Sequence, residues 1–147
     1  MERMDVETLL MRAEIEALST RFGRALDGGT LEEFLSIFTE DVAYRSGPRT
    51  LTGHDDLRAF FTKRAEGGRL SRHLMSSLMV ERTGPDTARG ESKWLVFAGQ
   101  LPAPASGTSP YVVADVEDDY LLTEAGWKIS RRTITPVFRD DGIPPPT

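Results

Sequence analysis

The most constraining feature of this sequence is a change in the spacing of its apolar side chains near residue 69. Before that position, apolar residues recur every three or four positions, which places them on one face of an α-helix. After it, apolar and polar residues alternate over long runs, as they do along a half-buried β-strand. Helices followed by a series of strands indicate an α+β fold, with the helices packed on one face of a mostly antiparallel sheet.

The part of the chain before residue 69 predicts three helices, with two short strands between the second and the third. The first and third helices should cover residues 5–27 and 54–66, and the strands residues 41–46 and 49–52. The second helix should begin at Thr30, because Glu33 follows three residues later and completes a capping box. Its apolar residues extend to Phe38.

The part after residue 69 predicts four long strands. These should cover residues 70–82, 87–100, 110–123 and 127–138. Short turns join the first strand to the second and the third to the fourth, and a Pro-rich loop joins the second to the third. Because 147 residues is the size of one domain, we expect a single domain over residues 1–139 and an extended Pro-rich tail over residues 140–147.

The composition excludes several classes of function. The chain has 18 Lys and Arg against 23 Asp and Glu, so no basic stripe is available for a nucleic-acid backbone. It has no Cys, which removes thiolate nucleophiles and Cys-based metal sites. No apolar run reaches the roughly 18 residues of a membrane span, and no apolar leader follows the charged start of the chain. We therefore expect a cytoplasmic protein with no nucleic-acid partner and no membrane partner.

The sequence also lacks the common cofactor motifs. It has no Gly-rich phosphate loop, no Rossmann glycine pattern and no Gly-x-Ser-x-Gly elbow. Its two histidines, His54 and His73, do not have the i, i+4 spacing of a helical metal site. We therefore expect no cofactor and no metal.

Several short motifs follow one another in a characteristic order over about residues 10–135. They are Phe22–Asp27 with Gly28–Glu32, Phe38–Tyr44, Gly53, Ser71–His73, Asp118–Tyr120 and Gly126–Arg132. Together they resemble the SnoaL-like family of the cystatin-like α+β cone superfamily, in the branch of scytalone dehydratase, polyketide cyclases and hexachlorocyclohexane dehydrochlorinase. The resemblance implies three N-terminal helices packed on a curved, mostly antiparallel sheet, with a conical cavity between them.

The resemblance also implies a pair of catalytic residues, Asp27 and His73. A neutral imidazole can accept a proton at neutral pH, and a carboxylate on its other nitrogen fixes its tautomer. The alternative is that His73 is a half-buried strand residue bonded to a backbone carbonyl. Two departures from the family matter: Phe22 stands where this branch commonly has Tyr, and no second pocket His follows on the later strands.

Alternation along the predicted strands gives the candidates for substrate binding. It places His73, Met75, Ser77 and Met79 on the inward face of the first long strand, and Trp94 inward on the next. The full set of substrate-binding candidates is Phe22, Tyr44, Met75, Trp94, Asp118 and Tyr120. Packing is the alternative for each aromatic residue. Most acidic residues near Asp118 should form cross-strand ion pairs with Arg131 and Arg132, and Asp118 is the first candidate for a pocket acid.

These observations lead to two functional hypotheses. The first is a cofactor-independent lyase or isomerase-type enzyme that uses the His-Asp dyad in a dehydration, elimination or cyclisation. Its substrate would be a hydrophobic cyclic or polyketide-like small molecule. The alternative is a non-catalytic binding or assembly module, similar to the small subunit of ring-hydroxylating dioxygenases. Apolar residues on both faces of the long strands predict a homodimer or homotrimer.

Overall fold

The computed structural model describes residues 3–142 and has the α+β architecture predicted from the sequence. Its elements are α1 (Val6–Gly28), α2 (Leu31–Leu35), β1 (Phe38–Ser46), β2 (Arg49–Thr52), α3 (Gly53–Glu66), β3 (Arg69–Arg82), β4 (Thr87–Gln100), β5 (Val112–Thr123) and β6 (Gly126–Arg139). The predicted tail falls mostly outside the described residues, which end at Gly142. No helix within residues 3–142 has the length and hydropathy needed to cross a bilayer.

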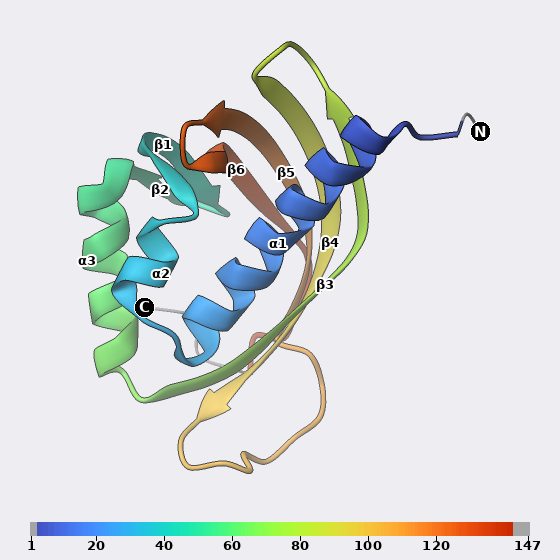
Figure 1. The fold of residues 1–147 in the computed structure, drawn as a ribbon. Helices are drawn as coiled ribbons and strands as arrows, with labels where there is room; N and C mark the ends of the chain where they lie inside the picture. Colours follow the sequence, from blue (N-terminus) through green and yellow to red (C-terminus); the bar gives the residue numbers. More distant parts are fainter. Residues whose placement is uncertain (1–2, 143–147) are drawn as a thin grey trace.

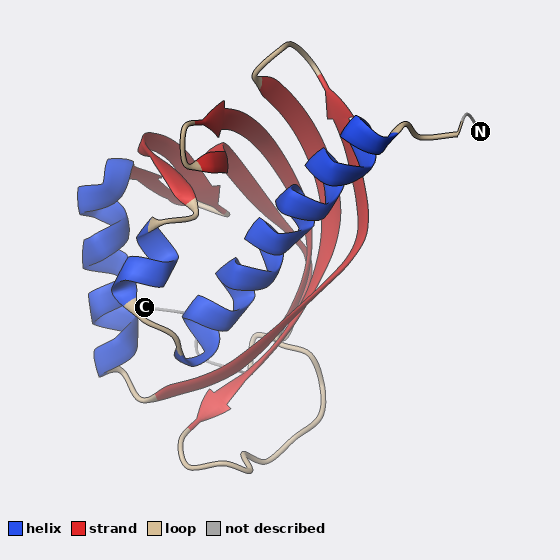
Figure 2. Cartoon of the chain, viewed as in Figure 1, coloured by secondary structure: helices blue, strands red, loops and turns tan. Residues whose placement is uncertain are grey.

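The six strands form one curved sheet in the order β2-β1-β6-β5-β4-β3. All neighbouring strands are antiparallel except β1 and β6, which run parallel. The sheet curves around α1, which lies along its concave face, while α2 and α3 stand beside the end of the sheet formed by β1 and β2 (Figure 1). All three helices therefore lie on one side of the sheet (Figure 2), and the predicted cystatin-like cone is confirmed.

The second helix is shorter than its apolar pattern suggests. The predicted cap is present, because the Thr30 hydroxyl accepts a hydrogen bond of 3.2 Å from the Glu33 backbone N–H. The helix ends at Leu35, however, and Phe38 begins β1 instead of extending the helix. The carbonyl of Ile37 accepts a 2.9 Å hydrogen bond from the N–H of Ile129 in β6, so pairing with the sheet replaces the next helical turn.

A β-bulge changes the inward face of β3. Between Ser76 and Met79 the register with β4 shifts by one residue, and Ser77 adopts a left-handed backbone conformation with φ of 58°. The prediction that Ser77 and Met79 point inward is therefore wrong, because the extra residue reverses the alternation. Leu78 is buried in their place, whereas Met79 is 70% exposed.

The outer, convex face of the sheet carries a continuous apolar band. Leu74, Leu95, Val113 and Phe138 occupy consecutive cross-strand positions on β3, β4, β5 and β6. Leu74 is 54% exposed and Phe138 is 70% exposed. We call these four residues the outer band. If the protein forms the predicted homodimer or homotrimer, the outer band is the surface expected to lie in the interface.

Candidate functional site

The predicted contact between Asp27 and His73 is present on the concave face of the sheet. Nδ1 of His73 lies 2.6 Å from Oδ1 of Asp27. The backbone N–H of His73 donates to Oδ2 of Asp27 at 2.8 Å, and the Ser71 hydroxyl donates to Oδ1 at 2.8 Å. The carboxylate thus holds both the ring and the backbone of His73, which fixes the orientation of the imidazole.

Close packing of α1 against β3 brings this pair together. Asp27 lies in the last turn of α1, one turn beyond Gly23. An ideal Cβ built on Gly23 would lie only 3.2 Å from Cβ of His73, so a larger residue would push the helix away from the strand. The His73 ring is held edge-on between Phe22 and Trp94, at centroid distances of 6.1 Å and 6.0 Å.

The surroundings favour a neutral imidazole facing an ionised carboxylate. Burial lowers the pKa of His73 below its usual value; the Arg64 and Arg69 cations lower it further, while the hydrogen bond to Asp27 opposes the shift. Burial acts to raise the pKa of Asp27, but its hydrogen bonds from His73 and Ser71 outweigh burial and hold that pKa below its usual range. With its proton on Nδ1 toward Asp27, His73 has Nε2 available as a proton acceptor.

Two residues that sequence analysis did not select extend this pair into a chain of hydrogen bonds. Nη2 of Arg64 donates to the Ser71 hydroxyl at 2.9 Å, and that hydroxyl donates in turn to Asp27. Ser71 is 2% exposed and Arg64 is 6% exposed. The alternation of β3 could have indicated Ser71, since it lies two residues before His73 on the same face. Nothing in the sequence distinguishes Arg64 from the solvated basic residues that commonly end a helix.

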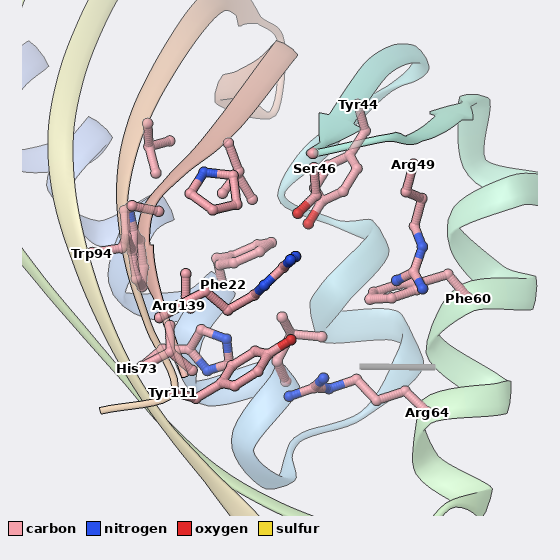
Figure 3. Close-up of a pocket in the computed structure, with 18 of the residues that line it drawn as sticks. Phe22, Tyr44, Ser46, Arg49, Phe60, Arg64, His73, Trp94, Tyr111 and Arg139 are labelled. Atoms are coloured by element: carbon pink, nitrogen blue, oxygen red, sulfur yellow. The ribbon is translucent and has the colours of Figure 1, made fainter. Parts of the chain in front are cut away.

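A cavity of about 220 Å³ lies between the helices and the sheet, and of the pair His73 lines it, whereas Asp27 does not. Four of the residues selected from the sequence line it: His73, Phe22, Tyr44 and Trp94 (Figure 3). The other lining residues are Leu26, Ser46, Gly47, Pro48, Arg49, Phe60, Arg64, Arg69, Val96, Tyr111, Val112, Ala114, Val116, Ile134, Pro136 and Arg139. None of the described residues hydrogen-bonds Nε2 of His73, which is the ring nitrogen left for a ligand.

The structure places the remaining candidates, Asp118, Tyr120 and Met75, outside this lining. Asp118 forms a buried bidentate ion pair with Arg132, with Nε and Nη2 each 2.8 Å from a carboxylate oxygen. The Tyr120 hydroxyl donates to the same carboxylate at 3.0 Å. Asp118, the predicted pocket acid, is thus engaged in the cross-strand ion pairing that was predicted for most acidic residues around it. Met75 packs half-buried against the hydrophobic core.

The ion pair supports the cavity from behind its wall. The Arg132 guanidinium lies 4.4 Å from the centroid of the Phe22 ring and 5.7 Å from that of Trp94. These contacts are cation–π interactions on the rings that flank His73. The other histidine, His54, lies in the first turn of α3 and does not line the cavity. Its Nε2 is 3.1 Å from the backbone carbonyl of Phe38.

Comparisons with solved structures agree with this architecture. A scytalone dehydratase candidate from Novosphingobium aromaticivorans DSM 12444 is 18% identical with a TM-score of 0.79, over 91% of this chain and 89% of that chain. LinA is 21% identical with a TM-score of 0.78, over 96% and 99% of the two chains. A cystatin-like protein from Nostoc punctiforme PCC 73102 is 24% identical with a TM-score of 0.72, over 98% of both chains. At these identities the likeness establishes the fold.

The family follows from the sequence match itself. No curated protein sequence matches this chain. The family model described as the SnoaL-like domain, however, matches residues 7–133, which include nearly all of α1, the strands β1 to β5, the first part of β6 and both members of the Asp27–His73 pair. The chain therefore belongs to the SnoaL-like domain family.

Proposed function

We propose that this protein is a cofactor-independent lyase or isomerase-type enzyme that acts on a hydrophobic cyclic small molecule, with His73 as its proton acceptor. One observation carries the proposal. His73 has one ring nitrogen fixed by the half-buried carboxylate of Asp27, while the ring itself lines a largely apolar cavity. A strand histidine with a purely structural role would have no need of a cavity beside its second nitrogen.

In this mechanism Nε2 of His73 removes a proton from a carbon atom of the substrate. The electrons of the broken C–H bond form a C=C bond to the neighbouring carbon. Either a leaving group on that carbon departs with its own bonding electrons, or an existing double bond at that carbon shifts and its far carbon takes the proton back from His73. The Asp27 carboxylate stabilises the imidazolium that forms in the meantime. The apolar walls exclude water, which strengthens the electrostatic interaction within the pair.

A hydrogen-bond donor for the developing negative charge is also needed, since no second histidine is among the described residues that line the cavity. Tyr44 lines the cavity and is 3% exposed. Its side chain and that of Ser46 point into the cavity from β1 (Figure 3). Burial raises the pKa of Tyr44, so its proton stays in place at neutral pH and can be donated to a substrate oxygen.

Proton exchange on a simple carbon acid tests the proposal without knowledge of the natural substrate. We expect the protein to accelerate exchange of the α-protons of 2-tetralone, a cyclic ketone, in D2O, as followed by NMR. His73→Gln and Asp27→Asn should each lower the acceleration by on the order of 10²–10⁴-fold. The losses should not add in the double variant, because the two residues act as one unit.

His54→Gln is the matched control, because it removes the only other histidine without touching the cavity. Its exchange rate should equal that of the wild type. The proposal fails if His54→Gln and His73→Gln reduce exchange equally. It also fails if His73→Gln lowers the melting temperature strongly while the folded fraction keeps full activity.

The alternative prediction, a non-catalytic assembly module, has one observation in its favour. The outer band offers an apolar surface across four strands, with Leu74 and Phe138 more than half exposed. Light scattering on wild-type protein and Phe138→Glu tests this surface. A wild-type homodimer or homotrimer that becomes a monomer in Phe138→Glu would fit an enzyme that assembles with itself. Co-purification of a larger partner in fixed stoichiometry would favour the module instead.

A further inference from the structure

The charge of the cavity differs from the charge of the chain. The whole protein has a net charge of -5. Among the described residues that line the cavity, however, there are four arginines and no aspartate or glutamate: Arg49, Arg64, Arg69 and Arg139. A cavity with one sign of charge and apolar walls focuses its potential on whatever enters it.

Two of these arginines are placed to meet a ligand. Arg64 projects from α3 and Arg139 from the end of β6, and their side chains point into the cavity from opposite sides (Figure 3). Nη2 of Arg64 is bonded to Ser71, but its buried Nε has no hydrogen-bond partner among the described residues. Nε of Arg139 donates a hydrogen bond of 3.2 Å to the Asp141 carboxylate, which orients the side chain.

The surroundings of Arg64 indicate which kind of ligand group would balance its charge and accept a hydrogen bond from its Nε. Burial, together with the nearby Arg69 cation, lowers the pKa of Arg64 to about 10. This cation is therefore less stable here than in water. Asp27, whose negative charge acts on it, is already bonded to His73 and Ser71. An anion in the cavity would supply both the missing charge and the missing acceptor.

We infer that the ligand of this cavity is a hydrophobic carboxylic acid, whose carboxylate lies between Arg64 and Arg139 and whose ring lies against Phe22 and Trp94. The inference rests on the proposed function and names the substrate class for the same site. A guanidinium matches the planar carboxylate with two parallel donors. An apolar cavity of roughly 150 Å³ accommodates benzene, so the 220 Å³ observed here suits an acid with one or two rings.

Binding of an acid and its neutral amide separates the role of charge from that of shape. We expect wild-type protein to bind 2-naphthoate at least about tenfold more tightly than 2-naphthamide by isothermal titration calorimetry, since hydrogen bonds to charged groups contribute this much or more. Arg64→Met should bring the ratio of the two affinities close to one, with 2-naphthamide binding little changed. Arg139→Met should reduce the same ratio, and it tests the inference even if Arg64→Met does not fold.

Arg58→Met is the matched control, because Arg58 lies on the same helix but pairs on the surface with Asp55. It removes the same charge and should keep the wild-type ratio. Equal binding of the acid and the amide to wild-type protein would overturn the inference, as would an unchanged ratio in both Arg64→Met and Arg139→Met. Failure of both compounds to bind would overturn it too. The exchange of 2-tetralone, a neutral ketone, would still report separately on the proposed proton transfer.

Discussion

Two carboxylates on the concave side of this protein, one buried and one half-buried, are used in different ways. Asp118 is bonded to two nitrogens of Arg132 and to the Tyr120 hydroxyl, and none of these three residues lines the cavity. Asp27 is bonded to Ser71 and to His73, and His73 does line the cavity. We call these the closed cluster and the open cluster.

The comparison shows that burial and ion pairing do not by themselves mark a functional site. Both clusters contain an acidic residue, a basic residue and a hydroxyl group, and both connect at least two elements of secondary structure. They differ in the last polar atom of the network. In the closed cluster the network ends within the core, whereas in the open cluster it ends at an imidazole nitrogen beside an empty volume. Only the second arrangement can exchange a proton with a ligand.

The largest expected difference between the clusters is in stability. Asp118→Asn leaves the Arg132 cation buried without a charged partner, and we expect a loss of about 3–5 kcal/mol of unfolding free energy. Asp27→Asn should cost only about 1 kcal/mol, because the amide oxygen still accepts a hydrogen bond from His73. Urea unfolding measures both values. Equal losses would mean that Asp27 is as structural as Asp118.

A double variant sharpens this result. Replacing Asp118 by Leu and Arg132 by Met together removes the ion pair without leaving a buried charge, and much of the stability should return. If the double variant is no more stable than Asp118→Asn, loss of packing around Arg132, and not its unpaired charge, accounts for the effect.

Two glycines allow each cluster to be disturbed without a change of charge. An ideal Cβ on Gly23 would lie 3.2 Å from His73, and one on Gly90 would lie 3.0 Å from the Tyr120 ring and hydroxyl. Each change to Ala should overpack its site, at a cost of about 1–3 kcal/mol. Gly23→Ala should also slow 2-tetralone exchange by roughly tenfold or more, because it displaces the base. Gly90→Ala should leave exchange at the wild-type rate, and the comparison breaks if the two variants behave alike.

The smallest effect is a pH dependence that belongs to the open cluster. The folded-state pKa of His73 is lowered, chiefly by burial, so its contribution to stability is present above the unfolded pKa of about 6.5 and is lost as pH falls through the folded pKa. Below pH 6.5 the wild type should lose up to roughly 1.4 kcal/mol per pH unit through this group. Between pH 7.5 and pH 5, the melting temperature should fall less steeply with pH in His73→Gln than in the wild type. An equal pH dependence in the two proteins would contradict the assignment.

Much of the fold could be predicted because its signals are local. The change of period near residue 69, the cap at Thr30 and the hairpin turns each follow from a few neighbouring residues, and the observed elements agree. The partnership of Asp27 with His73 was different. These residues are 46 positions apart, and only the resemblance to a family suggested their contact, which the structure then placed at 2.6 Å.

The parts that could not be predicted depend on distances across the molecule. Arg64 looks like an ordinary basic residue at a helix end, and only the packing of α3 turns it toward Ser71. Alternation correctly placed Asp118 on the inward face of β5. Alternation does not show, however, which inward residues line a cavity and which are covered by other side chains. The bulge at Ser77 leaves no mark in a pattern of alternating residues.

That bulge has a consequence for how the length of this chain can vary. Ser77 and Leu78 together oppose the single residue Ser92, so Ser77 is the supernumerary member. Deleting it would leave His73 and Met75 on the inner face with Leu78 and Val80. Deleting a residue of β3 away from the bulge would instead exchange the two faces beyond the deletion. Position 77 is therefore where a relative could lose one residue and keep the same chemistry in its cavity. What such a relative would give up is the local bend of the strand.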